Sequence, residues 1–451
     1  MKETTSISRR GLLRLATGAA APLAGFARFG MMNAFAQPAN DYKALVCVFL
    51  FGGNDGHNLL IPQATAQFNA YKSARGTLAL PDTNTKLMPV TAKNGTPYAL
   101  NDGFSSIQPL WAQGRLAAVA NVGNIVQPTS RTQYLSGAPV PTNLFSHSDQ
   151  VLQMQTATPG GSGGTGWAGR VSDQVQNLNG AATFPASVSL SGQQIFCSGN
   201  VVQSASLIPG YDMLPYGMNI WPATAGTARL QSLQSILTMD SGLAMVQKAN
   251  KVRQDALDLS AMLASAASGT PLQTVFPGTS IGNQLKQVAQ ILQLRNTLGM
   301  KRQVFFCSLG GFDTHGSQSW QQWDLFKQVG AAMLSFYQAT QELGIADKVT
   351  TFLESEFGRT LQPSGTGSDH GWGNHFLVLG GAVNGGDVYG KFPDLSLGGP
   401  DDTGSRGALL PSTALDQYGA TMAQWFGVPD ASLDAVFPSL KNFSVRNLGF
   451  V

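Results

Sequence analysis

Short apolar runs of strand length recur through this chain, and several of them end in a glycine-rich turn. The first is KALVCVFLFGGNDG at residues 43–56, and a continuous apolar run of this kind is typical of a strand buried on both faces. Comparable runs follow at residues 114–124, 303–311, 348–358 and 375–381. These segments predict the central strands of a large sheet.

Helical segments alternate with these strands in the second half of the chain. Helical periodicity is seen at residues 227–268, 282–299, 323–344 and 412–427. The alternation predicts the α/β class, with a doubly wound, mostly parallel sheet between helices. We expect a single domain over residues 37–451, with residues 159–280 as an inserted cap or helical elaboration. In such sheets the loops at the carboxyl ends of the strands form the ligand site.

The N-terminus has the pattern of an export signal. SRRGLLRLAT at residues 8–17 contains paired arginines before leucines, and AFA at residues 34–36 fits signal peptidase cleavage. We therefore expect residues 1–36 to be a twin-arginine signal peptide, with the twin-arginine translocase as partner during export. The mature protein would be periplasmic or secreted. The other interpretation is an amphipathic N-terminal helix.

Composition excludes several classes of protein. Only 12% of the residues are charged, against 43% hydrophobic, and the formal net charge is +3. No cluster of basic and aromatic residues is present, so we expect no nucleic-acid partner. The longest uncharged part of the N-terminal segment is short for a bilayer, and we expect no stable membrane span in the mature chain.

The chain has five histidines, and each lies in a segment that also carries an aspartate. Four occur in the turns GGNDGHN, FDTHG and SDHGWGNH, and the fifth occurs in FSHSDQ, at the start of an expected helix. Imidazole and carboxylate ligands without thiolates suit Zn²⁺, Mn²⁺ or Fe, and Ca²⁺ is possible on the carboxylate side. Ordinary caps and turns are the competing interpretation, since aspartate is common at helix N-termini.

Here the motifs resemble known families. SDHGWGNH resembles the TSDHG…GxH signature of the alkaline phosphatase superfamily, which includes sulfatases and phosphodiesterases. With GGNDG, GWAGR, FDTHG and SEFGR, residues 42–450 also resemble the domain-of-unknown-function 1501 family. The resemblance implies an alkaline phosphatase-like three-layer sandwich and an exported protein whose substrate is unassigned.

The resemblance also implies the metal ligands. It assigns Asp55, Asp369 and His370 to one metal, and Asp313, His315 and His375 to the other. The spacing in FDTH is shorter than in the phosphatases, and the strand at residues 348–358 ends in extra carboxylates. Glu356 is therefore a candidate ligand or general base, or else a solvated loop charge.

Superfamily members place a nucleophile at a helix N-terminus, where free N–H groups hold an anion. Ser146 is the first candidate and Ser148 the second, with metal-activated water as the other possibility. Either serine could instead be a helix cap, with Asp149 as a dipole partner. The cysteines lack the context of a formylglycine sulfatase.

The remaining candidates concern the substrate. Arg359 and Arg170 follow glycines in expected loops, and a guanidinium binds phosphate or sulfate oxygens well. Salt bridges within the loops are the competing interpretation for both arginines. His147 and His57 are assigned to substrate binding.

These observations together predict an exported hydrolase of phosphate monoesters or diesters, small or polymer-borne. The cofactors would be two divalent ions, Zn²⁺ or Mn²⁺ first and Ca²⁺ or Fe next, ~3.5–4 Å apart and acting in an in-line displacement. The alternatives are a non-catalytic envelope binding protein, a sulfate-ester hydrolase without formylglycine, and a single-metal structural site.

Overall fold

A large mixed sheet forms the centre of the protein, seen here in a computed structural model. The structure describes residues 42–451 except residues 84, 162, 211–217, 219–220, 240 and 268–270. Among these residues, nine strands form the main sheet in the order β13-β5-β12-β9-β1-β8-β6-β7, with β14 pairing to β5. The export signal expected at residues 1–36 lies outside the described residues.

The strands of this sheet are largely those that the apolar runs predict. All but the first residue of β1 are buried, and β5, β9 and β12 are buried throughout. The main-sheet strands are β1 (Lys43–Leu50), β5 (Leu116–Gly123), β6 (Ser187–Ser189), β7 (Ala205–Ser206), β8 (Arg302–Leu309), β9 (Val349–Glu354), β12 (Asn374–Gly380), β13 (Val388–Tyr389) and β14 (Thr413–Ala414).

Most of the sheet is parallel. β1 pairs in parallel with β8 and with β9, and β6 pairs in parallel with β8. β12 is antiparallel to both of its neighbours, β5 and β9. The antiparallel direction has a local cause, because β12 follows β9 through a hairpin rather than through a crossover helix. The predicted α/β class is confirmed.

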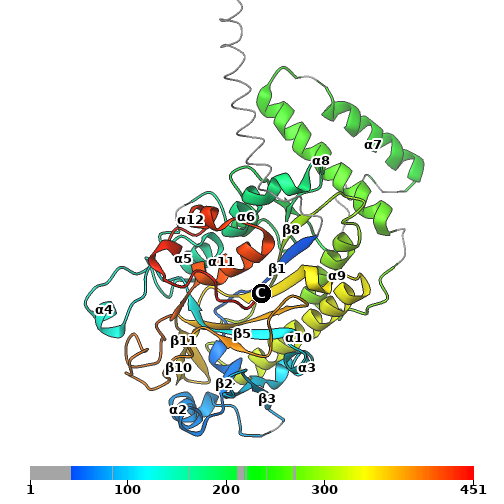
Figure 1. The fold of residues 1–451 in the computed structure, drawn as a ribbon. Helices are drawn as coiled ribbons and strands as arrows, with labels where there is room; N and C mark the ends of the chain where they lie inside the picture. Colours follow the sequence, from blue (N-terminus) through cyan, green and yellow to red (C-terminus); the bar gives the residue numbers. More distant parts are fainter. Residues whose placement is uncertain are drawn as a thin grey trace, which may run out of the picture. The chain divides into compact units, whose positions relative to one another are not determined.

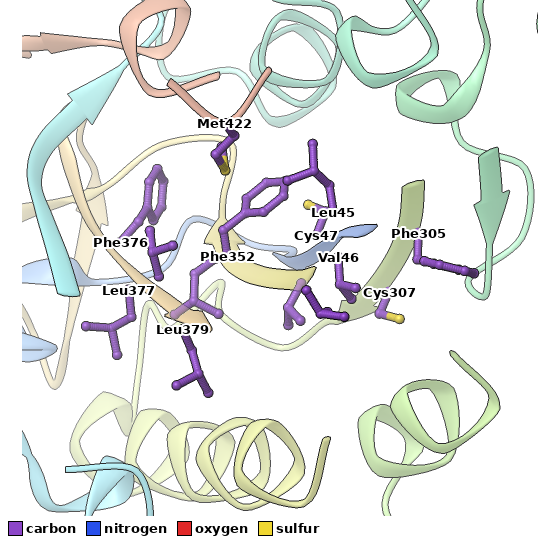
Figure 2. Packing of buried hydrophobic residues seen from close by; sticks show 14 of the residues in the cluster. Leu45, Val46, Cys47, Phe305, Cys307, Phe352, Phe376, Leu377, Leu379 and Met422 are labelled. Atoms are coloured by element: carbon purple, nitrogen blue, oxygen red, sulfur yellow. The ribbon is translucent and has the colours of Figure 1, made fainter. Parts of the chain in front are cut away.

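Helices cover both faces of the sheet (Figure 1). Figure 2 shows Met422 of α11 packed on one face, close to Phe352 and Phe376, while α9 and α10 lie on the other face. The helices are α2 (Thr65–Arg75), α3 (Pro109–Ala112), α4 (Arg131–Leu135), α5 (His147–Thr156), α6 (Trp167–Val175), α7 (Ala223–Leu237), α8 (Ala244–Ala267), α9 (Ser280–Gln293), α10 (Gln318–Glu342), α11 (Leu415–Phe426) and α12 (Leu433–Val436).

Two small sheets accompany the main one among the described residues. β2 (Leu60–Pro62), β4 (Pro97–Asn101) and β3 (Leu87–Thr91) form a three-stranded antiparallel sheet. β10 (Arg359–Ser364) and β11 (Gly367–His370) form the hairpin between β9 and β12. The SDHG stretch at residues 368–371, expected to be a loop, is therefore mostly strand, and His370 pairs with Arg359.

The region at residues 159–280 is only partly separate from the sheet. It supplies α6, which packs against β8, and two strands of the sheet, β6 and the edge strand β7. Within the described part of the region, α7 and α8 are the helices that extend it beyond the sheet (Figure 1). None of the described helices has both the length and the apolar character that crossing a bilayer requires.

Candidate metal centre

The carboxyl ends of three neighbouring parallel strands bring the histidine and carboxylate motifs together. β1, β8 and β9 end at Leu50, Leu309 and Glu354. Gly52, after β1, has a φ of 119°, and a Cβ atom there would lie 2.3 Å from the backbone nitrogen of Asp313. Only glycine permits this conformation and approach. The loops after β1 and β8 are therefore in direct backbone contact.

Three histidine side chains meet at one carboxylate oxygen, Asp313 Oδ1. The Nε2 atoms of His315, His147 and His370 lie 3.0, 3.4 and 3.4 Å from it, respectively. His315 Nε2 is also 3.0 Å from His370 Nε2. The rings come from the loop after β8, the first residue of α5 and the last residue of β11. This group, with Asp369, is called the histidine cluster below.

Two of these rings are oriented by their other nitrogen. His147 Nδ1 is 2.9 Å from Glu356 Oε1, and His370 Nδ1 is 2.7 Å from the carbonyl oxygen of Phe145. Since both partners are acceptors, each Nδ1 carries the proton of a neutral ring, and the Nε2 lone pair faces the centre. Metal-binding histidines are held in the same way.

The charge states of His370 and Asp313 suit a cation. Burial lowers the pKa of His370, which keeps that ring neutral at neutral pH. The hydrogen bond to Glu356 raises the pKa of His147. Burial opposes ionisation of Asp313, but the hydrogen bond and charge of Arg359 outweigh it, and the pKa of Asp313 is lowered.

Two groups of side chains within the described residues could hold a metal ion. They are His147, Asp313 and His370, and His315, Asp369 and His370, with the ligand atoms of each group within 4.8 Å of one another. His147 Nε2 is buried without a hydrogen-bond partner, which is unfavourable for a polar atom. A cation would satisfy it, and the imidazole and carboxylate donors fit Zn²⁺ or Mn²⁺.

Arg359 organises the loops around the cluster. Its side chain is fully buried and bonded to Asp313. Its guanidinium also donates to four backbone carbonyls, those of Gly52 and Gly53 after β1, Phe312 after β8 and Ser368 in β11. Because these bonds use its donors, Arg359 has no free pair of N–H groups with which to bind a phosphate group. This arrangement differs from the catalytic, anion-binding role expected.

Glu356 supports the cluster from behind. It is buried, and one oxygen, Oε1, accepts from His147 and from the backbone nitrogen of Gly52 at 2.8 Å. The other oxygen accepts from Ser355 Oγ at 3.1 Å. Glu356 is therefore placed to orient His147, and its burial rules out the interpretation as a solvated loop charge.

Asp55 does not join the cluster. It is buried, and its Oδ2 atom accepts from the guanidinium of Arg75 and from Gln318 Nε2. Its Oδ1 accepts from the backbone nitrogen of His57 at 3.1 Å. The carboxylate that the resemblance assigns to a metal is here half of a buried ion pair. The structure thus differs from the expected ligand set at this position.

His375 and His57 also lie apart from the cluster, and together they are called the buried pair below. Both are buried, with ring centroids 5.4 Å apart. His375 Nδ1 accepts from the backbone nitrogen of Asn121 at 3.0 Å, and its ring stacks on Phe392. Burial lowers the pKa of His57 to about 3 and lowers that of His375 as well. Neither ring belongs to the two groups of described side chains that could hold a metal, and the metal role expected of His375 and the substrate role expected of His57 stay predictions.

Ser146 is next to the cluster in the chain, but its hydroxyl is directed elsewhere. It is the N-cap residue of α5 and donates to Asp149 Oδ2 at 2.5 Å. Ser148 is exposed, and its Oγ lies 3.3 Å from Ser146 Oγ. The geometry therefore presents neither hydroxyl to the point where the three imidazoles meet.

The guanidinium of Arg170 is bonded to backbone carbonyls of neighbouring segments. It lies in α6 and donates to the carbonyls of Val436 and Thr156, each at 2.6 Å, and of Thr165 at 2.9 Å. Burial lowers its pKa. These bonds join α6 to the end of α12 and of α5, and they leave Arg170 without the substrate-binding position expected.

A cleft opens beside the cluster. Its volume is about 420 Å³, and its lining includes the apolar side chains of Phe51 and Val151 together with His147, Asp313 and Glu356. Clefts with apolar walls and a few polar groups are typical small-molecule sites.

The sequence interpretation missed one cationic residue at the cluster, Arg406. Its Nη1 atom is 3.3 Å from Asp369 Oδ2, and 45% of its side chain is exposed. It belongs to DDTGSRG, residues 401–407, which follows none of the strand motifs. Because only 12% of the residues are charged, each arginine in a loop was a candidate, and this was the signal that could have identified Arg406.

The geometry can be compared with known proteins. A search of curated proteins finds no match for this chain. A family model described as "Protein of unknown function (DUF1501)" matches residues 42–426. The match covers most of the chain, all of the cluster and the buried pair, and the chain belongs to this family.

Proposed function

We propose that this protein is an exported, metal-dependent hydrolase of phosphate esters, with an alkaline phosphatase-like arrangement of its α/β sheet. The observation that carries the proposal is the approach of His147, His315 and His370 to Asp313 Oδ1. The histidine cluster lies at the carboxyl ends of parallel strands, where α/β proteins commonly bind ligands. The resemblance of the motifs to the phosphatase signature supplies the reaction class.

The geometry favours one ion per chain, fewer than the two expected from the resemblance. His370 belongs to both candidate groups, but a neutral imidazole offers only one lone pair. Its Nδ1 is already committed to the Phe145 carbonyl. One ion near His147, Asp313 and His370, with His315 beside it, uses every Nε2 atom of the cluster.

The chain's own residues then have distinct tasks. A bound divalent ion would polarise a phosphoryl oxygen and acidify a water molecule. Glu356 keeps the His147 ring oriented, and Arg359 keeps the loops and Asp313 in place. Phe51 and Val151 in the cleft would receive the organic part of the ester. Because the Ser146 hydroxyl is bonded to Asp149, we assign the attack to water rather than to serine.

The test combines metal analysis with an ester assay. The mature protein should contain about one Zn²⁺ or Mn²⁺ per chain by mass spectrometry of the metal, and should hydrolyse p-nitrophenyl phosphate or its bis-ester. Chelation should remove both metal and turnover, and metal addition should restore them. A Ser146→Ala variant should retain most turnover. A protein that binds no metal under any condition would refute the proposal.

A non-catalytic binding protein of the cell envelope is the second candidate. The hydrogen bond of the Ser146 hydroxyl to Asp149 favours it, because this bond engages the first candidate nucleophile. Tight metal binding without turnover of phosphate or sulfate esters would select this candidate.

Export by the twin-arginine route is part of the proposal. Replacing Arg9 and Arg10 by lysine should leave the folded protein in the cytoplasmic fraction, whereas the unchanged chain should be recovered from the periplasm or medium. Periplasmic recovery of the double variant at the wild-type level would count against this route.

A further inference from the structure

The arginine nearest to the centre of the cluster is already occupied. Arg359 is bonded to Asp313 and to carbonyls of the surrounding loops, so it cannot also grip a substrate anion. If the protein binds phosphate esters, another cationic group has to meet the phosphoryl oxygens, since such groups are commonly held by guanidinium forks.

Arg406 has the free donors that Arg359 lacks. Its Nη1 atom is paired with Asp369 Oδ2 at 3.3 Å, and this is the bond that its guanidinium makes with the described residues. Asp369 is itself a member of the histidine cluster, with a ligand atom within 4.8 Å of those of His315 and His370. The ion pair with Asp369 thus holds Arg406 beside the cluster, and the Nε and Nη2 atoms of Arg406 make no bond to the described residues.

The backbone that carries Arg406 is firmly held. Asp402 is fully buried, and its carboxylate accepts from the backbone nitrogens of Gly398, Gly404 and Gly407 at 2.8, 2.9 and 2.9 Å. The Arg406 carbonyl also accepts from the backbone nitrogen of Gln362 in β10, at 3.0 Å. The side chain therefore projects from an ordered turn.

A second arginine fixes the same turn from outside. Arg131, the first residue of α4, donates to the carbonyls of Asp402 and Gly404 at 2.8 and 3.0 Å. Its Nε and Nη2 edge is therefore committed to the turn. Among the arginines close to the cluster, Arg406 is the one whose guanidinium is both exposed and mostly unbonded within the described residues.

We propose that Arg406 binds the terminal phosphoryl group of a phosphate monoester, and that this contact selects monoesters over diesters. The inference rests on the proposed function, because the ester must also reach the ion held by the histidine cluster. The organic part of the substrate would lie in the cleft that His147 and Asp313 line.

The preference for monoesters follows from the number of oxygens. The Nε and Nη2 edge of a guanidinium pairs with two non-bridging oxygens at once. The cluster needs a third oxygen for the ion. A monoester offers three non-bridging oxygens, whereas a diester offers two and would have to give up one of these interactions.

The experiment measures binding, so it does not depend on turnover. Inorganic phosphate and dimethyl phosphate are titrated calorimetrically into the mature wild-type protein and into Arg406→Gln and Arg406→Lys variants. Arg446→Gln is the control, because Arg446 is also a partly exposed arginine paired with a carboxylate, that of Asp434. Metal content and melting temperature are recorded for every sample.

We expect the wild type to bind inorganic phosphate about tenfold or more tightly than dimethyl phosphate. Arg406→Gln should weaken phosphate binding by about tenfold and remove the preference, and Arg406→Lys should restore part of the affinity but less of the preference. The Arg446→Gln control should match the wild type. Metal content should be the same in all four proteins.

Equal phosphate affinity in the wild type and Arg406→Gln would overturn the inference while leaving the proposed function intact. So would a metal-loaded wild type that binds no phosphate. A wild type without metal would refute the proposed function. The titration would still decide the role of Arg406, because loss of phosphate affinity in Arg406→Gln supports the contact and unchanged affinity rejects it.

Discussion

His147, His315 and His370 lie at the edge of the sheet with their Nε2 atoms directed at one carboxylate, whereas His57 and His375 are enclosed with their rings 5.4 Å apart. Both sets come from segments that contain aspartate, and all but that of His147 also contain glycine. The local sequence therefore does not distinguish them.

The cluster and the buried pair differ in two features, which are the partner of the histidine Nδ1 atom and the exposure of the nearby aspartate. In the cluster, His147 and His370 each present Nδ1 to an acceptor, and Asp313 remains partly exposed. In the buried pair, His375 Nδ1 is an acceptor, and Asp55 is neutralised by Arg75. Both aspartates pair with an arginine, but the side chain of Asp313 is 46% exposed whereas that of Asp55 is fully buried. We therefore expect a histidine beside an aspartate to bind a metal where its Nε2 lone pair and the carboxylate are both accessible to the ion.

The sharpest test of this comparison is a pair of histidine variants. His370→Ala removes the ring shared by both candidate groups, so metal content should fall to background and turnover by more than about 100-fold. His375→Gln should keep about one ion per folded chain and mainly lower stability. Elemental analysis of both variants checks this, and equal metal loss in the two would erase the distinction.

The buried ion pair should be the next largest effect. Arg75→Met leaves Asp55 as an uncompensated buried charge, and unfolding in urea should show a loss of about 3–5 kcal/mol. Adding Asp55→Asn should recover part of it. The metal bound per folded chain should not change, and a loss of metal from the double variant would make Asp55 a ligand after all.

Acid should act on the buried pair before it acts on the rest of the core. The pKa of His57 is about 3 in the folded protein, against 6.5 for an exposed histidine, so the unfolded chain takes up more protons as pH falls through this window. Stability should therefore drop by about 2 kcal/mol for this residue between pH 7 and pH 5. His57→Gln should flatten the slope; an unchanged slope would mean that the ring is protonated when folded.

The smallest expected effect concerns the acceptor behind His147. Glu356→Gln keeps the shape but can present its amide nitrogen to the ring, so metal affinity should fall about 10–100-fold. Competition with a chelating dye measures it. Affinity equal to the wild type would show that Nδ1 orientation is not what separates the cluster from the buried pair.

Much of the sheet could be predicted because strands buried on both faces are nearly continuous in apolar residues, as in β1 and β9. Asp313, His315 and His370 could be placed together because parallel strands end at one edge. The sequence predicted a mostly parallel sheet but no direction for β12, which is antiparallel because a hairpin rather than a helix precedes it.

Other parts of the site depend on long-range partners. Nothing beside Asp55 in the sequence shows that Arg75, at the end of α2, will neutralise it. The tasks of Arg359 and Arg406 likewise depend on where distant carbonyls and carboxylates lie, and local spacing does not contain that information.

The hydrogen bonds of Arg359 have a consequence for how the centre is loaded. They connect the loops after β1 and β8 with β11 through the protein's own groups, so a cation is not required to assemble them. If the proposed ion binds there, we expect a centre built in this way to exchange it after the chain has folded. Its occupant would then reflect the metal supply of the compartment in which the mature protein resides, rather than that of the compartment in which it was synthesised.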